Sequence, residues 1–591
     1  MLAAAASGPG GATAIEDREA TALGAWGRDA AKLAATPRTT VVLDGAVYNR
    51  GELGGSGDDA ALIAGLHEEI GFERALDRLN GDFSIALHDR DSGELWLARD
   101  RFGVKPLYYA EGDRVLAFAS RPRALFGVPG VSREPNRQFV ALFAASHYRT
   151  IDNQPERSPY EDIAQLPAAH LLRFANGRAE VRRWWSLDAD DPVTGSEEEL
   201  AERYRDLLLD AVGIRVASAG RPAFTLSGGM DSSTVLACAV ERTGSKQEAF
   251  SSVYEDATYD ESDEIRTMLD SSVDRWHQVR IGSPDLLSTI SEMIDANDEP
   301  VATATWLSHY LLCREVAGGG FDSLLGGLGG DELNAGEYEY FFYFFADLVA
   351  AGREEELDRE TRSWIEHHDH PVFKKSFDVM RDGLDRLVDL STPGRCLPDR
   401  VRLLRYASAL DPGYFDLDSF EPVMDHPFSS YLKNRTYQDI YRETAPCCLR
   451  AADRQCTAFG LEVLWPFFDH RLVELMFRVP NGMKIRDGVT KRLLREATAD
   501  LLPEETRTRI AKTGWNAPAH AWFSGGGREL LLDLTGSESF RSRGIYRPEE
   551  VRRLIDEHEE IVRSGRPAEN HMMFLWQLVN LELWMQWLDA T

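Results

Sequence analysis

The sequence is short of positive charge. Of its 591 residues, 66 are Lys or Arg and 97 are Asp or Glu, so the formal net charge is −31. A surface with this excess of acid repels phosphate polymers and anionic lipid head groups. We therefore expect neither nucleic acid nor a membrane surface among the partners, whereas a basic peptide or a locally basic pocket is compatible with the composition.

Lysine is scarce even among the basic residues, because only nine of the 66 are Lys. Cysteine is rare too. The six cysteines are scattered and form no Cys-x-x-Cys pair: Cys238, Cys313, Cys396, Cys447, Cys448 and Cys456. This distribution is typical of a reduced, cytoplasmic protein whose thiols are small core residues.

Long hydrophobic runs are missing as well. Residues 1–11 are rich in Ala and Gly and have neither the basic start nor the apolar core of a signal peptide. The most apolar run, Tyr338–Ala351, contains Glu339 and Asp347 and is too short to span a bilayer. The sequence therefore predicts neither secretion nor a transmembrane segment.

The pattern of the N-terminal third predicts an α+β domain over residues 1–187. Residues 1–38 show no hydrophobic period and are expected to be loosely ordered, and Asp44–Gly45 is expected to be a turn. Short strands joined by turns then surround one helix, residues 58–70, which favours antiparallel sheets.

The remainder predicts a second domain of another class. Residues 188–196 are acidic, contain Pro and are the expected linker. From residue 197 to 591, a helix is followed by strand–helix alternation and then by a mostly helical part. Such alternation predicts an α/β domain with a parallel sheet, whose ligands bind at the carboxyl ends of the strands.

One glycine-rich loop stands at such a strand end. The apolar run 223–226 leads into Ser-Gly-Gly-Met-Asp-Ser-Ser, residues 227–233, and a helical pattern follows from Thr234 to Arg242. A strand, a glycine turn and a helix point backbone N–H groups at an anion. Asp231 would repel phosphate unless a cation lay between them, so the loop predicts phosphate together with Mg²⁺. No Lys follows the glycines, which excludes a Walker loop.

Two further motifs carry candidate groups. Residues 324–332 again form a strand, a glycine turn and an acid, so Asp331 is a candidate second Mg²⁺ ligand or, alternatively, a helix N-cap. Residues 491–495, predicted to lie on a helix, and 509–514 are basic. They could neutralise pyrophosphate and a developing oxyanion, or they could be a solvated helix face.

These motifs together resemble the asparagine synthetase superfamily. Its synthetase domain, an α/β ATP pyrophosphatase with a PP-loop, has an S-G-G-x-D-S-S loop, a G-x-G-x-D-E loop and an E-x-R-x-P-F-L-D segment, which resemble residues 227–233, 327–332 and 462–469. Its K-x-x-L-R and R-x-K-x-G elements resemble residues 491–495 and 509–514. Residues 43–53 and 80–109 resemble the family's Ntn-hydrolase-like glutaminase domain.

Three positions depart from the family. Its glutaminases need a Cys after the initiator Met, and position 2 here is Leu2, so an inactive glutaminase-like domain is expected. Leu328 stands where asparagine synthetases carry Glu and β-lactam synthetases carry Tyr. Leu464 stands where an Arg is expected. The adenylation half therefore resembles the family, and the acceptor half differs from it.

Residues 147–172 and the chain length are similar to lasso peptide cyclases within this superfamily. The resemblance implies an AMP-forming, ATP-dependent ligase that joins an Asp or Glu side chain of a precursor peptide to the core N-terminal amine. It also implies a leader peptidase and a leader-peptide recognition protein as partners. The alternatives are a β-lactam synthetase-like ligase, an ammonia-dependent asparagine synthetase-like ligase, and an inactive peptide-binding scaffold.

The resemblance assigns roles to individual residues. Asp231, Asp331 and Lys491 are the expected catalytic residues, with Asp231 and Asp331 also holding Mg²⁺. The general base of the amine attack stays open, with His309 and Glu299 considered. The residues expected to bind ATP are, for pyrophosphate, Ser227, Gly228, Gly229, Asp231, Ser232, Ser233 and Lys512, and, for adenosine, Leu226, Val253 and Gly327.

Overall fold

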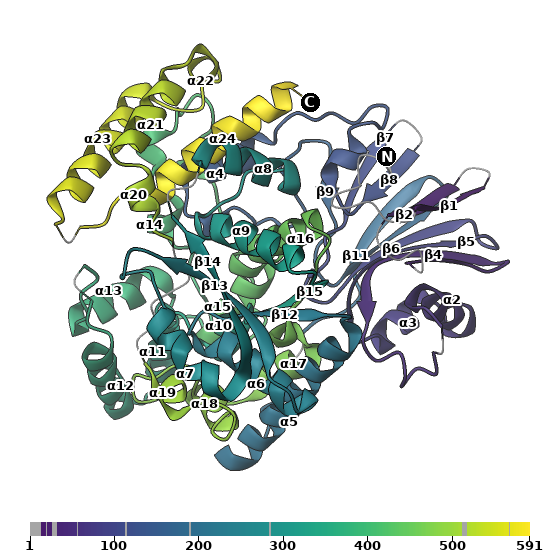
Figure 1. Ribbon diagram of the computed structural model, residues 1–591, viewed down its shortest axis with the longest axis horizontal. Coiled ribbons are helices and arrows are strands. Elements are labelled where there is room, and N and C mark those ends of the chain that lie inside the picture. The colour runs from purple at the N-terminus through teal and green to yellow at the C-terminus, as the bar shows by residue number, and fades with distance from the viewer. Residues whose placement is uncertain are drawn as a thin grey trace.

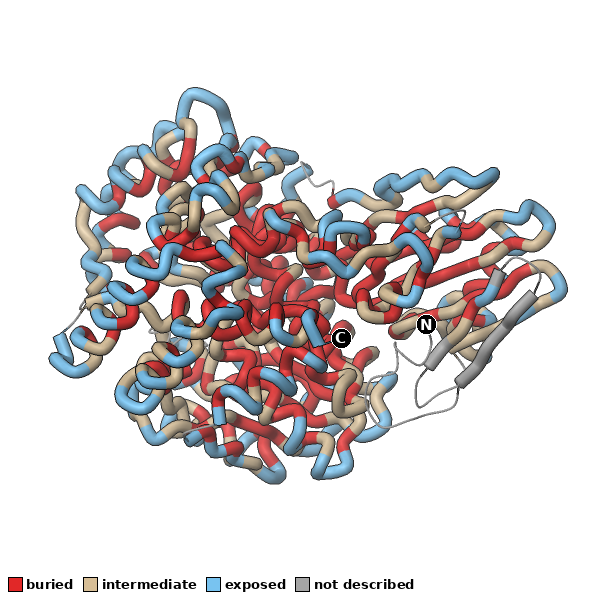
Figure 2. The backbone as a smooth tube through the Cα atoms, turned by 90° about the horizontal axis from the view of Figure 1, so that it is seen from above, coloured by how far each residue is buried: buried red, intermediate tan, exposed pale blue. Residues whose placement is uncertain are grey.

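The computed structural model has a β-rich N-terminal lobe and a larger lobe in which helices surround a central sheet (Figure 1). In both lobes a buried interior is rimmed by exposed loops (Figure 2). The structure describes residues 13–18, 21–26, 32–55, 57–112, 115–187, 191–282, 285–370, 372–510, 517–566 and 568–590.

An antiparallel sheet of strand order β11-β10-β6-β5-β4-β3 forms the centre of the N-terminal lobe. Side chains of alternate strand residues pack on helices on one face and on a smaller sheet, β8-β7-β9, on the other. The predicted α+β arrangement is confirmed. The elements are β3 (Leu33–Ala35), β4 (Thr39–Val47), α2 (Asp59–Ile70), α3 (Phe72–Arg78), β5 (Gly81–Asp89), β6 (Glu94–Arg99), β7 (Tyr108–Gly112), β8 (Val115–Ala119), α4 (Arg137–Ala145), β9 (Ala164–Gln165), β10 (His170–Ala175) and β11 (Arg178–Arg183).

Two predictions for this lobe are wrong where the structure describes it; residues 1–12, which include Leu2, lie outside the described residues, as do 19–20 and 27–31. Within the stretch expected to be loosely ordered, β1 (Thr13–Arg18) pairs with β2 (Thr21–Trp26), and β3 joins the edge of the central sheet. The turn expected at Asp44–Gly45 lies inside β4, where Gly45 pairs with Phe83 of β5. Gly45 has φ +112°, and a Cβ there would lie 2.0 Å from the Asp82 carbonyl oxygen. Strand pairing therefore overrides the local turn preference of Asp-Gly.

The larger lobe contains the predicted parallel sheet, in the order β14-β13-β12-β15-β16. Strands β12 and β15 are neighbours although about 100 residues separate them in sequence, so the loops at their carboxyl ends meet. The short β16 adds a third such loop. The strands are β12 (Pro222–Thr225), β13 (Gln247–Tyr254), β14 (Val273–Ile281), β15 (Ser323–Leu325) and β16 (Glu462–Leu464).

Helix α5 (Glu197–Ser218) begins where the predicted linker ends, with a capping box between Ser196 and Glu199. Helix α6 (Met230–Thr243) ends at Gly244 as expected but begins four residues earlier than predicted. Gly229 is extended and serves as its N-cap, and the Ser233 N–H already donates to the Gly229 carbonyl. Asp231, Ser232 and Ser233 of the glycine-rich motif therefore lie in the first turn of a helix.

Helices make up most of the chain after residue 331, as predicted. The C-terminal helix reaches the N-terminal lobe, since Trp584 packs edge-on against Phe139 and Tyr160. Among the described helices, none is long and apolar enough to cross a membrane. Their bounds are α7 (Ser262–Ser272), α8 (Leu286–Asn297), α9 (Thr305–Gly318), α10 (Gly330–Asn334), α11 (Tyr340–Ala350), α12 (Glu354–His367), α13 (Phe377–Leu387), α14 (Arg400–Leu403), α15 (Tyr431–Tyr441), α16 (Thr444–Ala458), α17 (His470–Arg478), α18 (Arg492–Ala497), α19 (Glu504–Thr508), α20 (Ala519–Trp522), α21 (Gly526–Gly536), α22 (Glu538–Ser542), α23 (Pro548–Ser564) and α24 (Met572–Ala590).

One lysine is buried in this lobe at a cost to stability. Lys484 is fully buried, and its ammonium lies 4.9 Å from the centre of the Phe477 ring. No hydrogen-bond acceptor among the described residues reaches its Nζ. Burial, with a smaller contribution from the charge of Lys433, lowers the pKa of Lys484 from 10.5 to about 7.

We expect Lys484→Met to stabilise the protein. Between about pH 7 and 10.5 the unfolded chain binds this proton and the folded chain does not, so the penalty is largest at pH 7 and fades as pH rises. The gain at pH 7 should be roughly 2–4 kcal/mol. Thermal unfolding at pH 7, 8.5 and 10 would measure it, with exposed Lys246→Met as the control. An equal melting temperature for the variant and the wild type at pH 7 would contradict this account.

Candidate functional site

Two glycine loops meet at the carboxyl edge of the parallel sheet. A Cβ on Gly327 would lie 2.6 Å from the Ser232 backbone nitrogen, and a Cβ on Gly330 would lie 2.4 Å from the Asp231 Cγ. Real Cβ atoms do not approach other atoms so closely, so only glycine fits at either position. The second loop therefore lies directly against Asp231, which the first loop carries. Gly327, predicted to line the adenosine site, is one of these contact residues.

The Lys491 ammonium joins the two loops. Its Nζ lies 2.5 Å from Asp231 Oδ2 and 2.7 Å from Asp331 Oδ1. The structure therefore brings the three predicted catalytic residues together, although they come from three distant segments. The prediction that Lys491 lies on a helix is wrong: it precedes α18 as the N-cap, with φ 58° in the left-handed region. This strained conformation directs its side chain between the aspartates.

A layer of residues behind this contact was missed by the sequence analysis. The Lys491 N–H donates to the Asn334 carbonyl, 3.3 Å away. The Asn334 side chain donates to the Gly330 carbonyl and accepts a hydrogen bond from the Tyr204 hydroxyl. Asn334 therefore links the second glycine loop, Lys491 and α5. In the sequence, the only feature that could have pointed to Asn334 is its position three residues after Asp331.

Gly336 is a second missed residue. A Cβ at this position would lie 2.1 Å from Asp331 Oδ1 and 2.3 Å from Lys491 Cε. Its N–H also donates to the Asp331 carbonyl, at 2.8 Å. Because it packs on both members of the ion pair, Gly336 sets how closely Asp331 and Lys491 approach one another.

The two aspartates fit a magnesium ion. They offer carboxylate oxygens from adjacent loops, and their side chains are 15% and 23% exposed. Mg²⁺ prefers oxygen ligands and commonly takes one or two carboxylates together with phosphate and water. Asp231 and Asp331 would hold the ion, which would neutralise the charge of a bound triphosphate. Lys491 would supply a further positive charge there.

The Glu332 carboxyl group, next to Asp331, is uncharged at neutral pH. Glu332 follows Asp331 in sequence and is buried. Burial, reinforced by the neighbouring charge of Asp331, raises the pKa of Glu332 from 4.5 to about 8. Its carboxyl group therefore keeps its proton at pH 7, and the site holds two carboxylates and one ammonium rather than three carboxylates.

Hydrogen bonds between two of its own serines, Ser227 and Ser232, close the first glycine loop. The Ser227 N–H donates to Ser232 Oγ at 3.1 Å, and the two hydroxyls lie 3.0 Å apart. Gly228 has a left-handed φ of 65°, and its carbonyl accepts a hydrogen bond from Arg509 at 2.9 Å. Ser233 is fully buried. Of the basic 509–514 segment, Arg509 thus contacts the loop, and Lys512 lies outside the described residues.

The residues predicted to line the adenosine site lie at neighbouring strand ends. The Leu226 N–H donates to the Phe250 carbonyl, and the Leu226 carbonyl accepts from the Ser251 hydroxyl. Trp276 in turn donates its indole N–H to that hydroxyl at 2.9 Å. Leu226 and Val253 are both buried. Ser251 and Trp276 therefore brace the strand end that leads into the phosphate loop.

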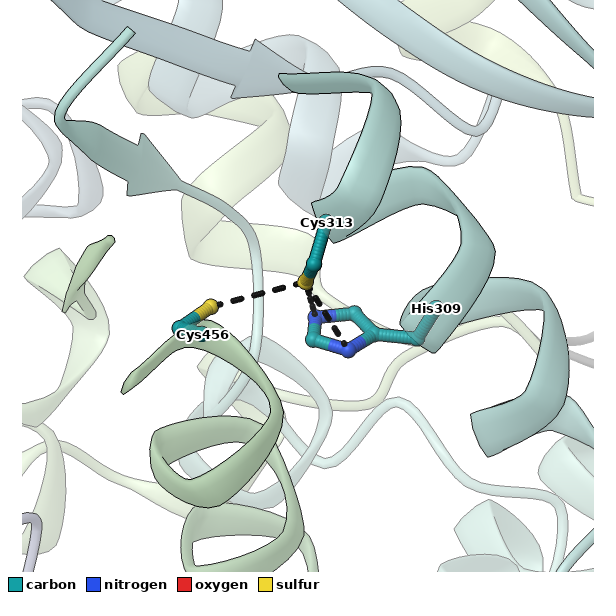
Figure 3. A group of neighbouring side chains, drawn as sticks. All are labelled: His309, Cys313 and Cys456. Carbon is teal, nitrogen blue, oxygen red and sulfur yellow. Dashed lines mark hydrogen bonds between the residues drawn. The ribbon is translucent and has the colours of Figure 1, made fainter. Parts of the chain in front are cut away.

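Neither group considered as a general base lies free for that role. Glu299 is buried and accepts a hydrogen bond from Arg450 at 2.6 Å, and Arg450 also pairs with Asp152. Burial raises the pKa of Glu299. His309 is buried, and its Nδ1 lies 2.8 Å from the Gln455 Oε1 and 3.5 Å from the Cys313 Sγ (Figure 3). The base therefore stays unassigned.

Comparison with known proteins gives matches over both lobes. Residues 203–586 match the family model described as asparagine synthase, and residues 32–185 match the glutamine amidotransferase domain. The glutamine-hydrolysing asparagine synthetase 3 of Bacillus subtilis is 26% identical over 525 residues, 84% of this chain and 78% of the relative. Asparagine synthetase 1 of the same organism is 23% identical over 570 residues, 92% of this chain and 86% of the relative.

A solved structure also matches in part. The glutamine phosphoribosylpyrophosphate amidotransferase of Bacillus subtilis, complexed with ADP and GMP, matches 42% of this chain and 62% of its own length. Its sequence identity is 12% and its TM-score 0.18, a likeness too low to carry an argument.

We expect Gly336→Ala to lower ATP-dependent turnover by about 100-fold, because displacing a catalytic group by 1 Å commonly costs that much. The added methyl group would push Asp331 and Lys491 apart. Pyrophosphate release is the measurement, and Gly536→Ala, where a Cβ meets nothing within 4 Å, is the matched control. Unchanged turnover with a folded Gly336→Ala protein would show that this spacing is unimportant.

Proposed function

The chain belongs to the asparagine synthase family, and on that premise we propose that it is a lasso peptide cyclase. At the family level it is an asparagine synthetase-like, ATP-dependent amide ligase. In the proposed reaction an Asp or Glu side chain of a precursor core peptide attacks the α-phosphate of ATP, and pyrophosphate leaves. The core N-terminal amine then attacks the activated carbonyl, AMP leaves and a macrolactam ring closes.

The observation that carries this proposal is the contact of Lys491 with Asp231 and Asp331. An ammonium held by two aspartates at a phosphate-type loop suits transfer of a negatively charged group. Lys491 would stabilise the negative charge that develops on the α-phosphate in the first step. In the second step it would stabilise the oxyanion of the tetrahedral intermediate. Asp231 and Asp331 would hold Mg²⁺, and the 227–233 loop would receive pyrophosphate through Ser227, Gly228, Gly229, Ser232 and Ser233.

The N-terminal lobe would act as a scaffold in this proposal. No cysteine occurs in residues 1–237, and motif residues of the lobe are engaged in contacts with the synthetase lobe. Lys105 is buried between Asp453 and Glu462, at 3.0 and 2.7 Å, and the Asn80 amide donates to Asp469. Such contacts support a structural role more than the hydrolysis of glutamine.

The leucine at position 328 favours a peptide amine over free ammonia as the nucleophile of the proposed reaction. It lies between Gly327 and Gly329 in the second loop and packs against the main hydrophobic core. A leucine can neither accept nor orient a proton, so the amine must be presented by its own substrate. Holding two ends of one peptide together can contribute about 7–11 kcal/mol to lowering the barrier. Lys512, Leu226, Val253 and Gly327 would complete the ATP site in this proposal.

Partners follow from the proposed substrate. A leader peptidase would free the core amine, and a leader-recognition protein would deliver the precursor. A β-lactam synthetase-like ligase, an ammonia-dependent asparagine synthetase-like ligase and an inactive scaffold are the competing functions. The first differs in its small β-amino acid substrate, the second in needing aspartate and ammonia, and the third in showing no ATP–pyrophosphate exchange.

We expect the purified protein, incubated with ATP, Mg²⁺ and leader-free core peptide, to yield a peptide lighter by one water together with AMP. Mass spectrometry and nucleotide chromatography would detect both. Formation of ADP would contradict adenylation. Pyrophosphate exchange stimulated by aspartate but by no core peptide would favour the asparagine synthetase-like function.

We expect Asp231→Asn and Asp331→Asn each to reduce turnover by about 100-fold or more, because each removes one charged ligand of the proposed Mg²⁺ site. Their melting temperatures should stay within a few degrees of wild type. Asp263→Asn on α7, whose side chain is 90% exposed, is the matched control and should keep full activity. Full activity in both site variants would remove the proposed metal site.

A further inference from the structure

The stretch 147–172 begins where the N-terminal lobe meets the synthetase lobe. Its first residue, His147, donates its N–H to the Arg402 carbonyl of the synthetase lobe at 3.0 Å. The short 3-10 helix η3 (Tyr148–Thr150) follows directly and carries Arg149. The backbone contact therefore fixes η3 on the synthetase lobe and sets the direction from which Arg149 enters it.

The Arg149 guanidinium joins two carboxylates of the synthetase lobe. Its side chain is only 7% exposed, and its Nη2 lies 3.2 Å from the Glu337 Oε2. Its Nη1 donates to the Glu339 Oε1, and its Nε donates to the Tyr148 hydroxyl at 3.4 Å. A guanidinium presents its N–H groups in a rigid planar fork. One arginine of the N-terminal lobe therefore holds two carboxylates in a set geometry.

The two carboxylates differ in their other surroundings. Glu339 pairs with two further arginines, Arg402 and, at 3.9 Å, Arg435. Burial acts to raise the pKa of Glu339, but the three arginine charges hold it well below its ordinary value. The Glu337 side chain is more open, at 27% exposure against 11% for Glu339. Loss of Arg149 would therefore leave Glu339 anchored by its other arginines but would remove the arginine that ties Glu337 to the N-terminal lobe.

Glu337 is bonded to the residue that sets the spacing of the Lys491 centre. It follows Gly336, whose N–H donates to the Asp331 carbonyl at 2.8 Å. A Cβ on Gly336 would lie 2.1 Å from Asp331 Oδ1 and 2.3 Å from Lys491 Cε, so the backbone here lies directly against both side chains. A shift of the Glu337 backbone is therefore passed through one peptide unit to the contact between Asp331 and Lys491.

We propose, on the basis of the proposed ligase function, that Arg149 of the N-terminal lobe is a positioning residue for the site and acts through Glu337 on the spacing of Asp331 and Lys491. Docking of the N-terminal lobe then completes the support of the second glycine loop. The lobe contributes to the reaction in this way without performing chemistry of its own.

This role has a consequence for metal binding, because Asp331 is a proposed Mg²⁺ ligand. Residues that orient a metal ligand from behind commonly change metal affinity or activity by about 10- to 100-fold when they are replaced. Loss of Arg149 should therefore weaken the binding of Mg²⁺·ATP by the folded protein. A merely structural role would lower the melting temperature and leave the affinity of the folded protein unchanged.

The test is titration calorimetry of the full-length protein with Mg²⁺·ATP. Arg149→Met keeps a long side chain and removes the guanidinium fork, and we expect it to weaken binding by about 10- to 100-fold. Arg402→Met is the matched control, since Arg402 pairs with Glu339 and Asp399, and it should bind as wild type does. Equal affinity in Arg149→Met and wild type would overturn the proposal, and so would an equal loss in both variants.

A double-variant cycle tests whether Arg149 acts through Glu337. Glu337→Ala should also weaken Mg²⁺·ATP binding, and the Arg149→Met/Glu337→Ala double variant should bind no more weakly than Arg149→Met alone. Losses that multiply in the double variant would contradict the link. If Arg149→Met does not fold, the half-exposed Glu337→Ala decides, and wild-type affinity in that variant would overturn the proposal.

The cyclisation assay separates this role from the proposed function. Turnover of leader-free core peptide should fall about 100-fold in Arg149→Met. Wild-type protein that binds Mg²⁺·ATP but closes no ring would contradict the cyclase function, and the affinities would still decide the role of Arg149. Wild-type protein that closes the ring, with Arg149→Met equal to it in affinity and turnover, would refute the role of Arg149 alone.

Discussion

The arrangement of the synthetase lobe depends on one lysine ammonium held between two aspartates. Lys491 connects the loop after β12, the loop after β15 and the segment before α18. Without a cation between them, the Asp231 and Asp331 carboxylates would face each other at short range in a partly desolvated site, which is costly. Gly327, Gly330 and Gly336 are glycines because the three segments approach one another more closely than any side chain allows.

A similar principle joins the two lobes. Buried charges meet across their boundary: Lys105 pairs with Asp453 and Glu462, and Arg215 lies 3.5 Å from Asp82. Although burial opposes it, the charge of Lys105 lowers the pKa of Glu462 to about 2. These pairs are satisfied only when the lobes are docked. This explains how an amidotransferase-type lobe can hold the synthetase lobe in place whether or not it performs chemistry.

Much of the site was predictable because its residues lie in compact motifs. The 227–233 loop and Asp331 each follow a pattern of strand, glycine and charge, and Lys491 opens a basic K-x-x-L-R element that resembles the family's. Gly336, Asn334 and Tyr204 were missed because each matters only through a neighbour that is distant in sequence or lies in an unpatterned turn. The helical assignment of Lys491 failed for a related reason, since the basic pattern around it carries no signal for the left-handed backbone at this residue.

The sequence by itself determined the fold class of each lobe, the family and the identity of the charged groups, because hydrophobic period, turn residues and motif spacing are local properties of the chain. The sequence also shows six cysteines, but it does not show that two of them, Cys313 and Cys456, lie beside His309 in the folded protein. Only the tertiary structure decided which charges meet. Strand order places β12 beside β15, helix packing places α9 beside α16, and both result from burial of apolar surface across residues far apart in sequence.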